Sequence, residues 1–278
     1  MTELEEFMAN IKDKSVNTQR AYKTQYNKLY NLIGKPIGDT SEAKILEAIS
    51  TLSNTNQKQA SINIGIHLRR MKDPPLSVLK LEAKRDANKK VLRENVKDTN
   101  RKLQETLPSY DTLLEYMNSL YEAENWTDYI INYLLLNFQT RNADLLFDII
   151  KRRKDATSDE KNYIWLTRDK AVFIRNVYKT ADSYGRKINE IYDTRFLIAL
   201  KRVIACKKQG EDCGVFIPTI SQVGYYIQKA TYKGLGEGNY FKIVVAHFRE
   251  DLLKIKEISD NRGTNIATIL SNYDIANV

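Results

Sequence analysis

The sequence contains few cysteine and histidine residues and no long apolar run. Of its 278 residues only two are cysteine and two are histidine, and Cys206 and Cys213 lack the spacing of a zinc site. Two cysteines are too few for a disulfide framework, which favours a reducing, intracellular compartment. No apolar run approaches the roughly 20 residues of a membrane helix, and the opening segment MTELEEFMANIKDK lacks the order of a secretory signal. These absences predict a soluble intracellular protein without a metal site or a membrane partner.

Loops that cradle nucleotide phosphates are also missing. The chain has no G-x-x-x-x-G-K string, and the glycines of GLGEG at residues 234–238 follow a helical pattern, which argues against a dinucleotide fold. The string HLRR at residues 67–70 lies on an amphipathic helix early in the chain, where we expect His67 to be partly packed. We therefore expect no cofactor.

Positive charge is in excess and is concentrated in one segment. Lys and Arg number 44 against 35 Asp and Glu, a net charge of +9. Such a surplus favours a polyanionic partner, nucleic acid before an acidic membrane. Residues 80–102 are either a solvated helical connector or a basic linker lying along a phosphate backbone. The candidate DNA contacts are Lys84, Arg85, Lys89, Lys90, Arg93, Lys97, Arg101 and Lys102, with Arg186 and Lys187 further along.

The hydrophobic pattern is mainly helical. In SVNTQRAYKTQYNKLYNLIG the apolar and aromatic residues recur at helical spacing, with Ser15 or Thr18 as N-cap and Gly34 in the terminating segment. Further helices precede KDPP at residues 72–75. The segment WTDYIINYLLLNFQTRNADLLFDII predicts a long helix, either continuous or interrupted at Arg141. The segments NYIWLTRDKAVFIRNVYKT and RKINEIY are rich in Ile, Val and Tyr and predict two or three short antiparallel strands.

The expected fold is therefore mainly α with a small antiparallel β-sheet, divided into two domains. We expect a helical domain at residues 1–95, a basic linker at 96–106, and an α+β domain at 107–278. The pattern after DTRFLIALKRVIACKK is helical again.

Cationic side chains and a late tyrosine follow one another through the second expected domain. They are Arg141 at the end of the most apolar segment, Lys179 after VFIRNVY, His247 and Arg249 in AHFRED, and Tyr273 in ILSNYDI. This order resembles that of tyrosine recombinases, the phage-integrase superfamily of DNA breaking–rejoining enzymes. The resemblance extends over nearly the whole chain, since SVNTQRAYKTQYNKLYNLIG resembles the first core-binding helix, the basic linker the interdomain clamp, and TRNADLL the first catalytic arginine motif.

The resemblance implies DNA strand cleavage and rejoining through a 3′-phosphotyrosyl intermediate, without a cofactor. It implies a homotetramer acting on double-stranded DNA, in site-specific recombination or integration. Arg141 and Arg249 would hold the non-bridging phosphate oxygens, with His247 beside them. Lys179 would protonate the departing 5′-hydroxyl, and Tyr273 would be the nucleophile.

Two of the motifs depart from the family pattern. His247 and Arg249 are two residues apart rather than three, so Arg262 in NRGTN is a rival second arginine. Arg186 and Lys187 rival Lys179 in the same hairpin. The family pattern LGH falls on LSN at residues 270–272. The nucleophile is therefore expected past the end of this sequence unless Tyr273 serves or cleavage has been lost.

Three functions remain open at this point. Besides the recombinase, the sequence allows a catalytically inactive DNA-binding protein of the same fold. It also allows a type IB topoisomerase-like enzyme, which acts as a monomer on one duplex. Each site residue also has a purely structural interpretation. In that interpretation Arg141 ends a helix and pairs with Asp144, His247 is a core residue, and Arg249 forms surface ion pairs.

Overall fold

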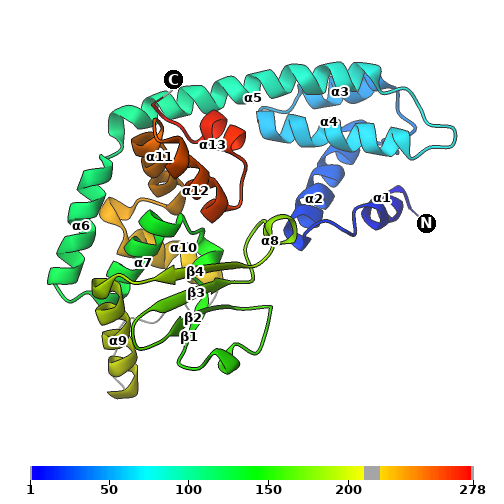
Figure 1. Cartoon of the computed structure of the whole chain (residues 1–278). Coiled ribbons are helices and arrows are strands. Elements are labelled where there is room, and N and C mark those ends of the chain that lie inside the picture. Colours follow the sequence, from blue (N-terminus) through cyan, green and yellow to red (C-terminus); the bar gives the residue numbers. More distant parts are fainter. Residues whose placement is uncertain (1, 210–219, 277–278) are drawn as a thin grey trace. The chain divides into compact units, whose positions relative to one another are not determined.

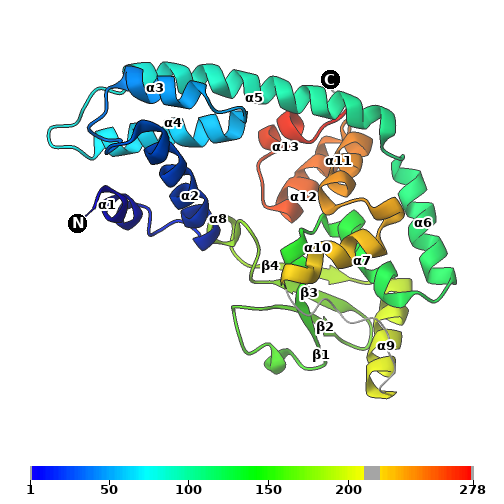
Figure 2. The ribbon, with the colours of Figure 1, turned by 180° about the vertical axis from the view of Figure 1, so that it is seen from behind.

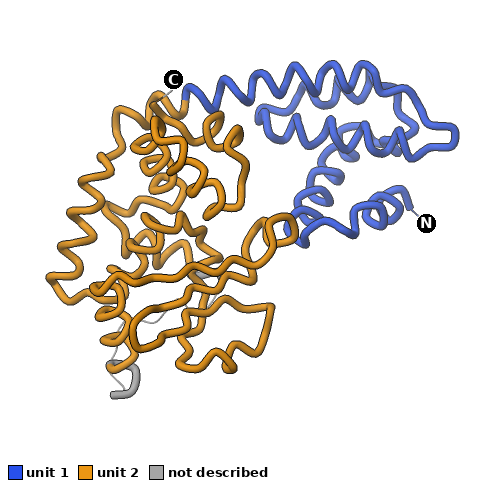
Figure 3. The backbone as a smooth tube through the Cα atoms, viewed as in Figure 1, with its two compact units in different colours: residues 1–98 blue, residues 99–278 orange. Residues whose placement is uncertain are grey.

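The computed structural model describes residues 2–209 and 220–276, and Cys213 lies outside them. The chain forms two compact units, residues 1–98 and residues 99–278 (Figure 3). The boundary falls inside one uninterrupted helix, α5 (Leu79–Thr106), which Figure 1 shows in cyan to green. Residues 96–106, expected as a linker, are thus the C-terminal turns of α5.

Unit 1 is built from helices. They are α1 (Glu3–Asn10), α2 (Val16–Ile33), α3 (Glu42–Ser50), α4 (Thr55–Arg70) and the first part of α5. Ser15 caps α2 by accepting a hydrogen bond from the backbone of Thr18, and Gly34 ends it in the left-handed conformation (φ 74°), as the sequence predicts. Phe7, Leu29 and Leu81 belong to a core that joins α1, α2 and α5.

Unit 2 combines helices with one small sheet. Its elements are α6 (Tyr110–Glu122), α7 (Trp126–Phe138), η1 (Asn142–Leu145), β1 (Phe147–Ile150), η2 (Arg153–Asp155), β2 (Asn162–Leu166), β3 (Ala171–Arg175), α8 (Ala181–Tyr184), β4 (Lys187–Ile191), α9 (Thr194–Gln209), α10 (Ile220–Ala230), η3 (Tyr232–Gly234), α11 (Glu237–Phe248), α12 (Leu252–Arg262) and α13 (Ile266–Asn272). Helices α7 and α10 lie beside the sheet in both views (Figures 1 and 2). One face of the sheet, with Ile164 and Phe173, joins the main core, and the other face, with Tyr163 and Val172, packs a small cluster of its own.

The mainly helical class with one small sheet is confirmed, and two details of the sequence prediction are wrong. The long helix ends at Phe138, and residues 147–150 form strand β1 instead. A short apolar run such as FDII fits a buried strand as well as a helix, so periodicity alone does not separate them. The sheet order is β1-β2-β3-β4, and β1 runs parallel to β2, which makes the sheet mixed rather than antiparallel.

No described helix is long and apolar enough to cross a membrane. Within residues 2–209 and 220–276, no group of three or more His, Cys, Asp and Glu side chains is arranged to hold a metal ion.

Candidate functional site

Arg141 stands directly after the apolar helix α7, in a segment whose conformation is fixed by its neighbours. Gln139 is left-handed (φ 46°) and ends α7, and Arg141 is extended before the short turn η1. The carboxylate of Asp144 accepts the backbone N–H of Arg141 at 3.1 Å. The guanidinium is half-buried, and its Nη1 is buried without a hydrogen-bond partner among the described residues. Helix α7 is therefore followed by a cation that no described carboxylate neutralises by direct contact.

Arg262 is fastened to the residues that precede Arg141. It is the last residue of α12, which Gly263 caps in the left-handed conformation (φ 62°). Its Nη1 donates to the carbonyl oxygens of Gln139 and Thr140, at 3.0 and 2.9 Å, and forms an ion pair with Glu237 at 2.7 Å. Burial first, and the charge of Arg262 next, lower the pKa of Arg141. Two like charges thus lie close together, an arrangement that a bound anion stabilises.

Lys187 adds a third cation from the sheet. At the start of β4, its ammonium donates to the carbonyl oxygens of Asp260 and Asn261, just before Arg262. Burial, followed by the charges of Arg175 and Arg141, lowers the pKa of Lys187 to about 8. Lys187 therefore loses its proton near pH 8 rather than near 10.5.

A buried ion pair lies next to these cations. Arg175, the last residue of β3, is fully buried and lies 3.5 Å from Asp144. It also donates to the carbonyl oxygens of Phe138 (3.4 Å) and Asn261 (3.0 Å) and to the side chain of Asn189 (3.0 Å). One side chain thus connects the end of α7, the end of α12 and strand β4. Asp144 pairs with Arg175 rather than with the side chain of Arg141, so the interpretation of Arg141 as the ion-pair partner of Asp144 is wrong.

Tyr273 lies one ring away from Arg262. The Arg262 guanidinium lies over the Phe241 ring at 4.4 Å, and the Tyr273 ring meets Phe241 edge-on at 4.7 Å. Tyr273 is also among the groups whose charge acts on the pKa of Arg141. Within the described chain its hydroxyl makes no hydrogen bond, which leaves it available to a ligand.

Buried polar atoms without partners gather at the same place. Eight such side-chain atoms occur in the described residues, and five of them belong to Thr140, Arg141, Asn142, Asp144 and Arg175. Buried polar groups in proteins are nearly always hydrogen-bonded. They comprise two guanidinium nitrogens, of Arg141 and Arg175, and three oxygens, of Thr140, Asn142 and Asp144, so unused donors and acceptors both lie in this region.

Comparisons with known proteins do not assign a family. No family model matches the chain, and no curated protein matches it. Among solved structures, the crystal structure of XerA recombinase is similar, with a TM-score of 0.38 and 12% identity, covering 98% of this chain and 91% of that chain. A likeness of this size carries no argument about function. The resemblance to tyrosine recombinases stays a prediction.

The structure brings together Arg141, Tyr273, Lys187 and Arg262, and it leaves His247 and Arg249 outside this group. His247 is exposed and stacks on Tyr110 at 4.3 Å, so its interpretation as a core residue is wrong. Arg249 pairs with Glu250 and Asp274 and donates to the carbonyl oxygen of Ala276.

The geometry of α11 explains why His247 is remote from the site. Glu237, at the start of α11, contacts Arg262. His247 follows ten residues later, which places it about 15 Å further along the helix axis. Gly263 marks the end of α12, but NRGTN resembles an ordinary loop and does not by itself distinguish Arg262 as a site residue.

Lys179 is flanked by residues of the site, but its own side chain is exposed. Thr180 donates to the carbonyl oxygen of Gly263 at 2.8 Å, and the Tyr178 ring lies under the Lys187 ammonium at 5.0 Å. Lys179 makes no hydrogen bond or ion pair to a described residue. Lys187 is therefore the lysine of this hairpin that faces the arginines, and Arg186 beside it is exposed.

The remaining DNA-contact candidates lie along α5. Five of them recur every fourth residue and form a basic stripe that winds slowly round the helix, namely Arg85, Lys89, Arg93, Lys97 and Arg101. The ion pairs of Lys89 with Asp86 and of Lys97 with Glu94 are exposed, so they hold these lysines weakly. Lys84, Lys90 and Lys102 are exposed on the same helix outside this series.

We expect the stripe to determine the salt dependence of DNA binding. Replacing Lys89, Arg93 and Lys97 by glutamine is expected to flatten the slope of log K against log salt by about 0.9 per lost phosphate contact, or roughly 2.7 in all. Duplex binding measured between 50 and 300 mM salt tests this, with Lys84→Gln as control because Lys84 lies about 180° from Arg93 round the helix. An equal effect of Lys84→Gln would contradict a one-sided stripe.

We expect anion binding to weaken as Lys187 loses its proton. With a pKa of about 8 in the free protein, the ammonium is charged at pH 7 and largely neutral at pH 9.5. Duplex affinity at constant ionic strength should therefore fall roughly tenfold over this range, the loss of one charge-assisted hydrogen bond. In Lys187→Arg the guanidinium stays charged and the profile should be flat. A midpoint near 10 in the natural protein would exclude Lys187 as the group responsible.

Proposed function

We propose that unit 2 binds a phosphodiester of double-stranded DNA at Arg141, Arg262 and Lys187. The observation that carries this proposal is the half-buried guanidinium of Arg141, which has no carboxylate contact and lies close to a second arginine. Guanidinium groups bind phosphate oxygens in pairs of parallel hydrogen bonds, and they stay charged when buried. Arg262 commits only Nη1 to described residues, which leaves its other donors for the ligand.

The proposed reaction is strand cleavage and rejoining by a tyrosine recombinase-like mechanism. The Tyr273 oxygen attacks the phosphorus and loses its proton to solvent, and the bond from phosphorus to the 5′-oxygen breaks. The 5′-oxygen takes its proton from the Lys187 ammonium, whose lowered pKa suits proton transfer near neutral pH. Arg141 and Arg262 stabilise the charge on the non-bridging oxygens. Reversal of these steps rejoins the strand.

In this proposal α5 supplies the sequence-independent part of the binding. Its basic stripe supports contact with the phosphate backbone, with unit 1 as the DNA clamp and residues 107–278 as the catalytic domain. Assembly into a homotetramer on DNA belongs to the same proposal and follows from the resemblance alone.

A non-catalytic DNA-binding protein is the second candidate, and one observation favours it. No described residue is hydrogen-bonded to the Tyr273 hydroxyl, so nothing in the described chain holds this hydroxyl in a fixed position. A type IB topoisomerase-like enzyme is the third, since it would use the same groups as a monomer on one duplex.

Covalent trapping separates these functions. The protein is incubated in EDTA with duplex DNA carrying a nick or a phosphorothiolate, and adducts are resolved on a denaturing gel. We expect an adduct that disappears in Tyr273→Phe. An adduct that survives Tyr273→Phe would place the nucleophile elsewhere. Tight, salt-sensitive binding without an adduct would support the non-catalytic candidate. Relaxation of plasmid without a specific site would favour the topoisomerase.

A further inference from the structure

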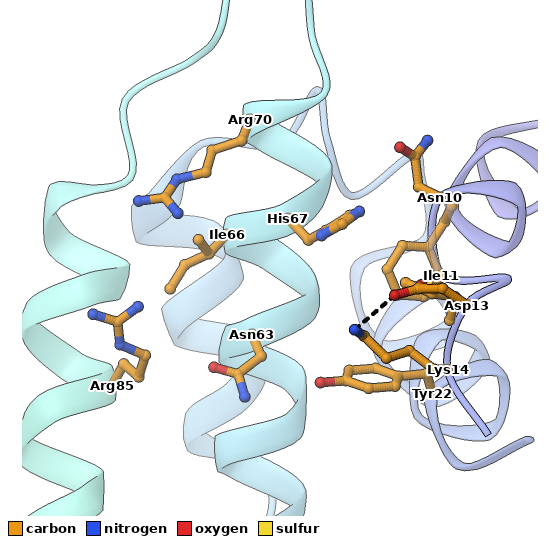
Figure 4. A pocket seen from close by; sticks show the side chains of 11 residues that line it. Asn10, Ile11, Asp13, Lys14, Tyr22, Asn63, Ile66, His67, Arg70 and Arg85 are labelled. Atoms are coloured by element: carbon orange, nitrogen blue, oxygen red, sulfur yellow. Dashed lines mark hydrogen bonds and ion pairs between the residues drawn. The ribbon is translucent and has the colours of Figure 1, made fainter. Parts of the chain in front are cut away.

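A cavity lined by polar, charged and aromatic side chains lies wholly within unit 1. It has a volume of about 360 Å³ and is bounded by α1, α2, α4 and the start of α5 (Figure 4). Asn63, His67 and Arg70 line it from one face of α4, since residues three, four and seven apart share a helix face. The size is within the range of sites that bind small organic ligands.

One wall of this cavity is aromatic and uncharged. The ring of Phe7, which is buried, meets His67 edge-on at 5.3 Å and Tyr22 edge-on at 6.0 Å. Burial lowers the pKa of His67, so the imidazole is neutral at physiological pH. Its Nε2 is buried and has no hydrogen-bond partner among the described residues. The wall therefore offers planar faces for stacking and one unsatisfied polar atom at its edge.

The rest of the lining is basic and amidic. Three cations, Lys14, Arg70 and Arg85, line the cavity with one carboxylate, Asp13. Glu82, outside the lining, pairs with Arg70 at 2.7 Å and with Arg85 at 3.7 Å, and the Arg70 side chain stays 55% exposed. The Lys14–Asp13 pair is exposed on both sides, with side-chain exposures of 55% and 66%, so a ligand anion can replace the carboxylate at little cost. The Asn63 side chain has no hydrogen bond within the described chain, which leaves a donor and an acceptor for the edge of a ligand.

We propose that this pocket binds one unpaired nucleotide. The base lies against His67 and Tyr22, with its polar edge at His67 Nε2 and Asn63, and the phosphate lies at Lys14 and Arg70. A planar heterocycle joined to an anion satisfies all three features of the lining, whereas an apolar ring leaves the amide and the imidazole unpaired. The nucleotide comes either as a free nucleoside monophosphate or from an unpaired position in a DNA strand.

The test is calorimetric titration of the full-length protein with deoxyadenosine monophosphate. We expect saturable binding that weakens about 3- to 10-fold in Lys14→Met and in His67→Phe, as the loss of one hydrogen bond predicts. His67→Phe keeps the ring, and its melting curve shows whether the variant is folded. Lys12→Met is the matched control, because Lys12 is an exposed cation two residues from Lys14 that does not line the pocket. Equal effects of Lys12→Met and Lys14→Met would overturn the proposal.

Two further arms identify the source of the nucleotide and the role of the base. If the nucleotide comes from DNA, a duplex with one bulged nucleotide should bind more tightly than the fully paired duplex. The difference between the two affinities should be smaller in Lys14→Met than in the natural protein. The assignment is overturned if Lys14→Met and His67→Phe keep both the monophosphate affinity and the bulge preference of the natural protein. Binding of 2-deoxyribose 5-phosphate as tight as that of the nucleotide also overturns it, since the base then contributes nothing. Each arm is repeated in Arg141→Ala, which tests the phosphodiester site of unit 2 separately.

Discussion

Replacing Arg175 by methionine is expected to lower the free energy of unfolding by about 3–5 kcal/mol, the range found when one partner of a buried ion pair is removed. Arg175 is fully buried, and its loss leaves Asp144 buried without its partner. Burial already raises the pKa of Asp144 against the opposing charge of Arg175. The carbonyl oxygens of Phe138 and Asn261 lose a donor as well. Urea unfolding at pH 7 measures the change.

The double variant Arg175→Met/Asp144→Asn provides the control for charge. Asparagine is neutral, and its side-chain oxygen can still accept the Arg141 backbone N–H that Asp144 accepts. If the uncompensated carboxylate causes the loss, the double variant should recover much of the stability. A double variant as unstable as Arg175→Met would instead assign the loss to the carbonyl contacts.

Replacing Arg262 by lysine is expected to slow formation of the protein–DNA adduct by about 10²–10³-fold, the usual effect of removing one donor to transition-state charge. The planar guanidinium of Arg262 has donors enough for Gln139, Thr140, Glu237 and a phosphate. Lysine keeps the charge, but its single ammonium cannot contact all of these groups at once. Duplex affinity should change little, because most phosphate contacts belong to α5. Single-turnover kinetics with a nicked duplex separate the two effects.

Arg249→Lys is the matched control for this prediction. Arg249 is the arginine that the spacing in the sequence favours, yet it is bonded to Asp274 and Ala276 rather than to the residues around Arg141. We expect its rate to stay within about threefold of the natural protein, because lysine keeps the charge that faces the buried carboxylate of Asp274, and Arg249 bonds to neither Gln139 nor Thr140. The opposite ranking, with Arg249→Lys slow and Arg262→Lys normal, would refute the site. If the natural protein forms no adduct, affinity for inorganic phosphate provides the same comparison.

The sequence predicts those parts of the molecule that depend on local rules. The cap at Ser15, the stop at Gly34 and the strands β2, β3 and β4 follow from spacing and turn residues. The sequence also distinguishes Arg141, because a charged residue is unusual at the end of the most apolar segment of a chain.

The rest of the site depends on contacts between distant segments. Nothing local in NRGTN reveals that Arg262 bonds to Gln139 and Thr140, which lie more than a hundred residues away. Arg175 is still less visible, because β3 reads as an ordinary apolar strand and only the fold shows that its last residue is buried against Asp144. The sequence predicts a helix where β1 forms for the same reason, because β1 pairs with residues of β2 that are not its neighbours in the sequence.

Main-chain carbonyl oxygens hold three of the site cations of unit 2 in place. Carbonyls of Gln139, Thr140 and Asn261 fix the positions of Arg262, Arg175 and Lys187 without cancelling their charge. With Arg141 the group has four cations against the two carboxylates of Asp144 and Glu237, so 4 − 2 leaves +2 near neutral pH. A phosphate bound among these cations, as proposed above, would relieve their mutual repulsion. Phosphate binding at the proposed site and folding of this region of unit 2 would then be linked, so that phosphate would raise the stability of the native state.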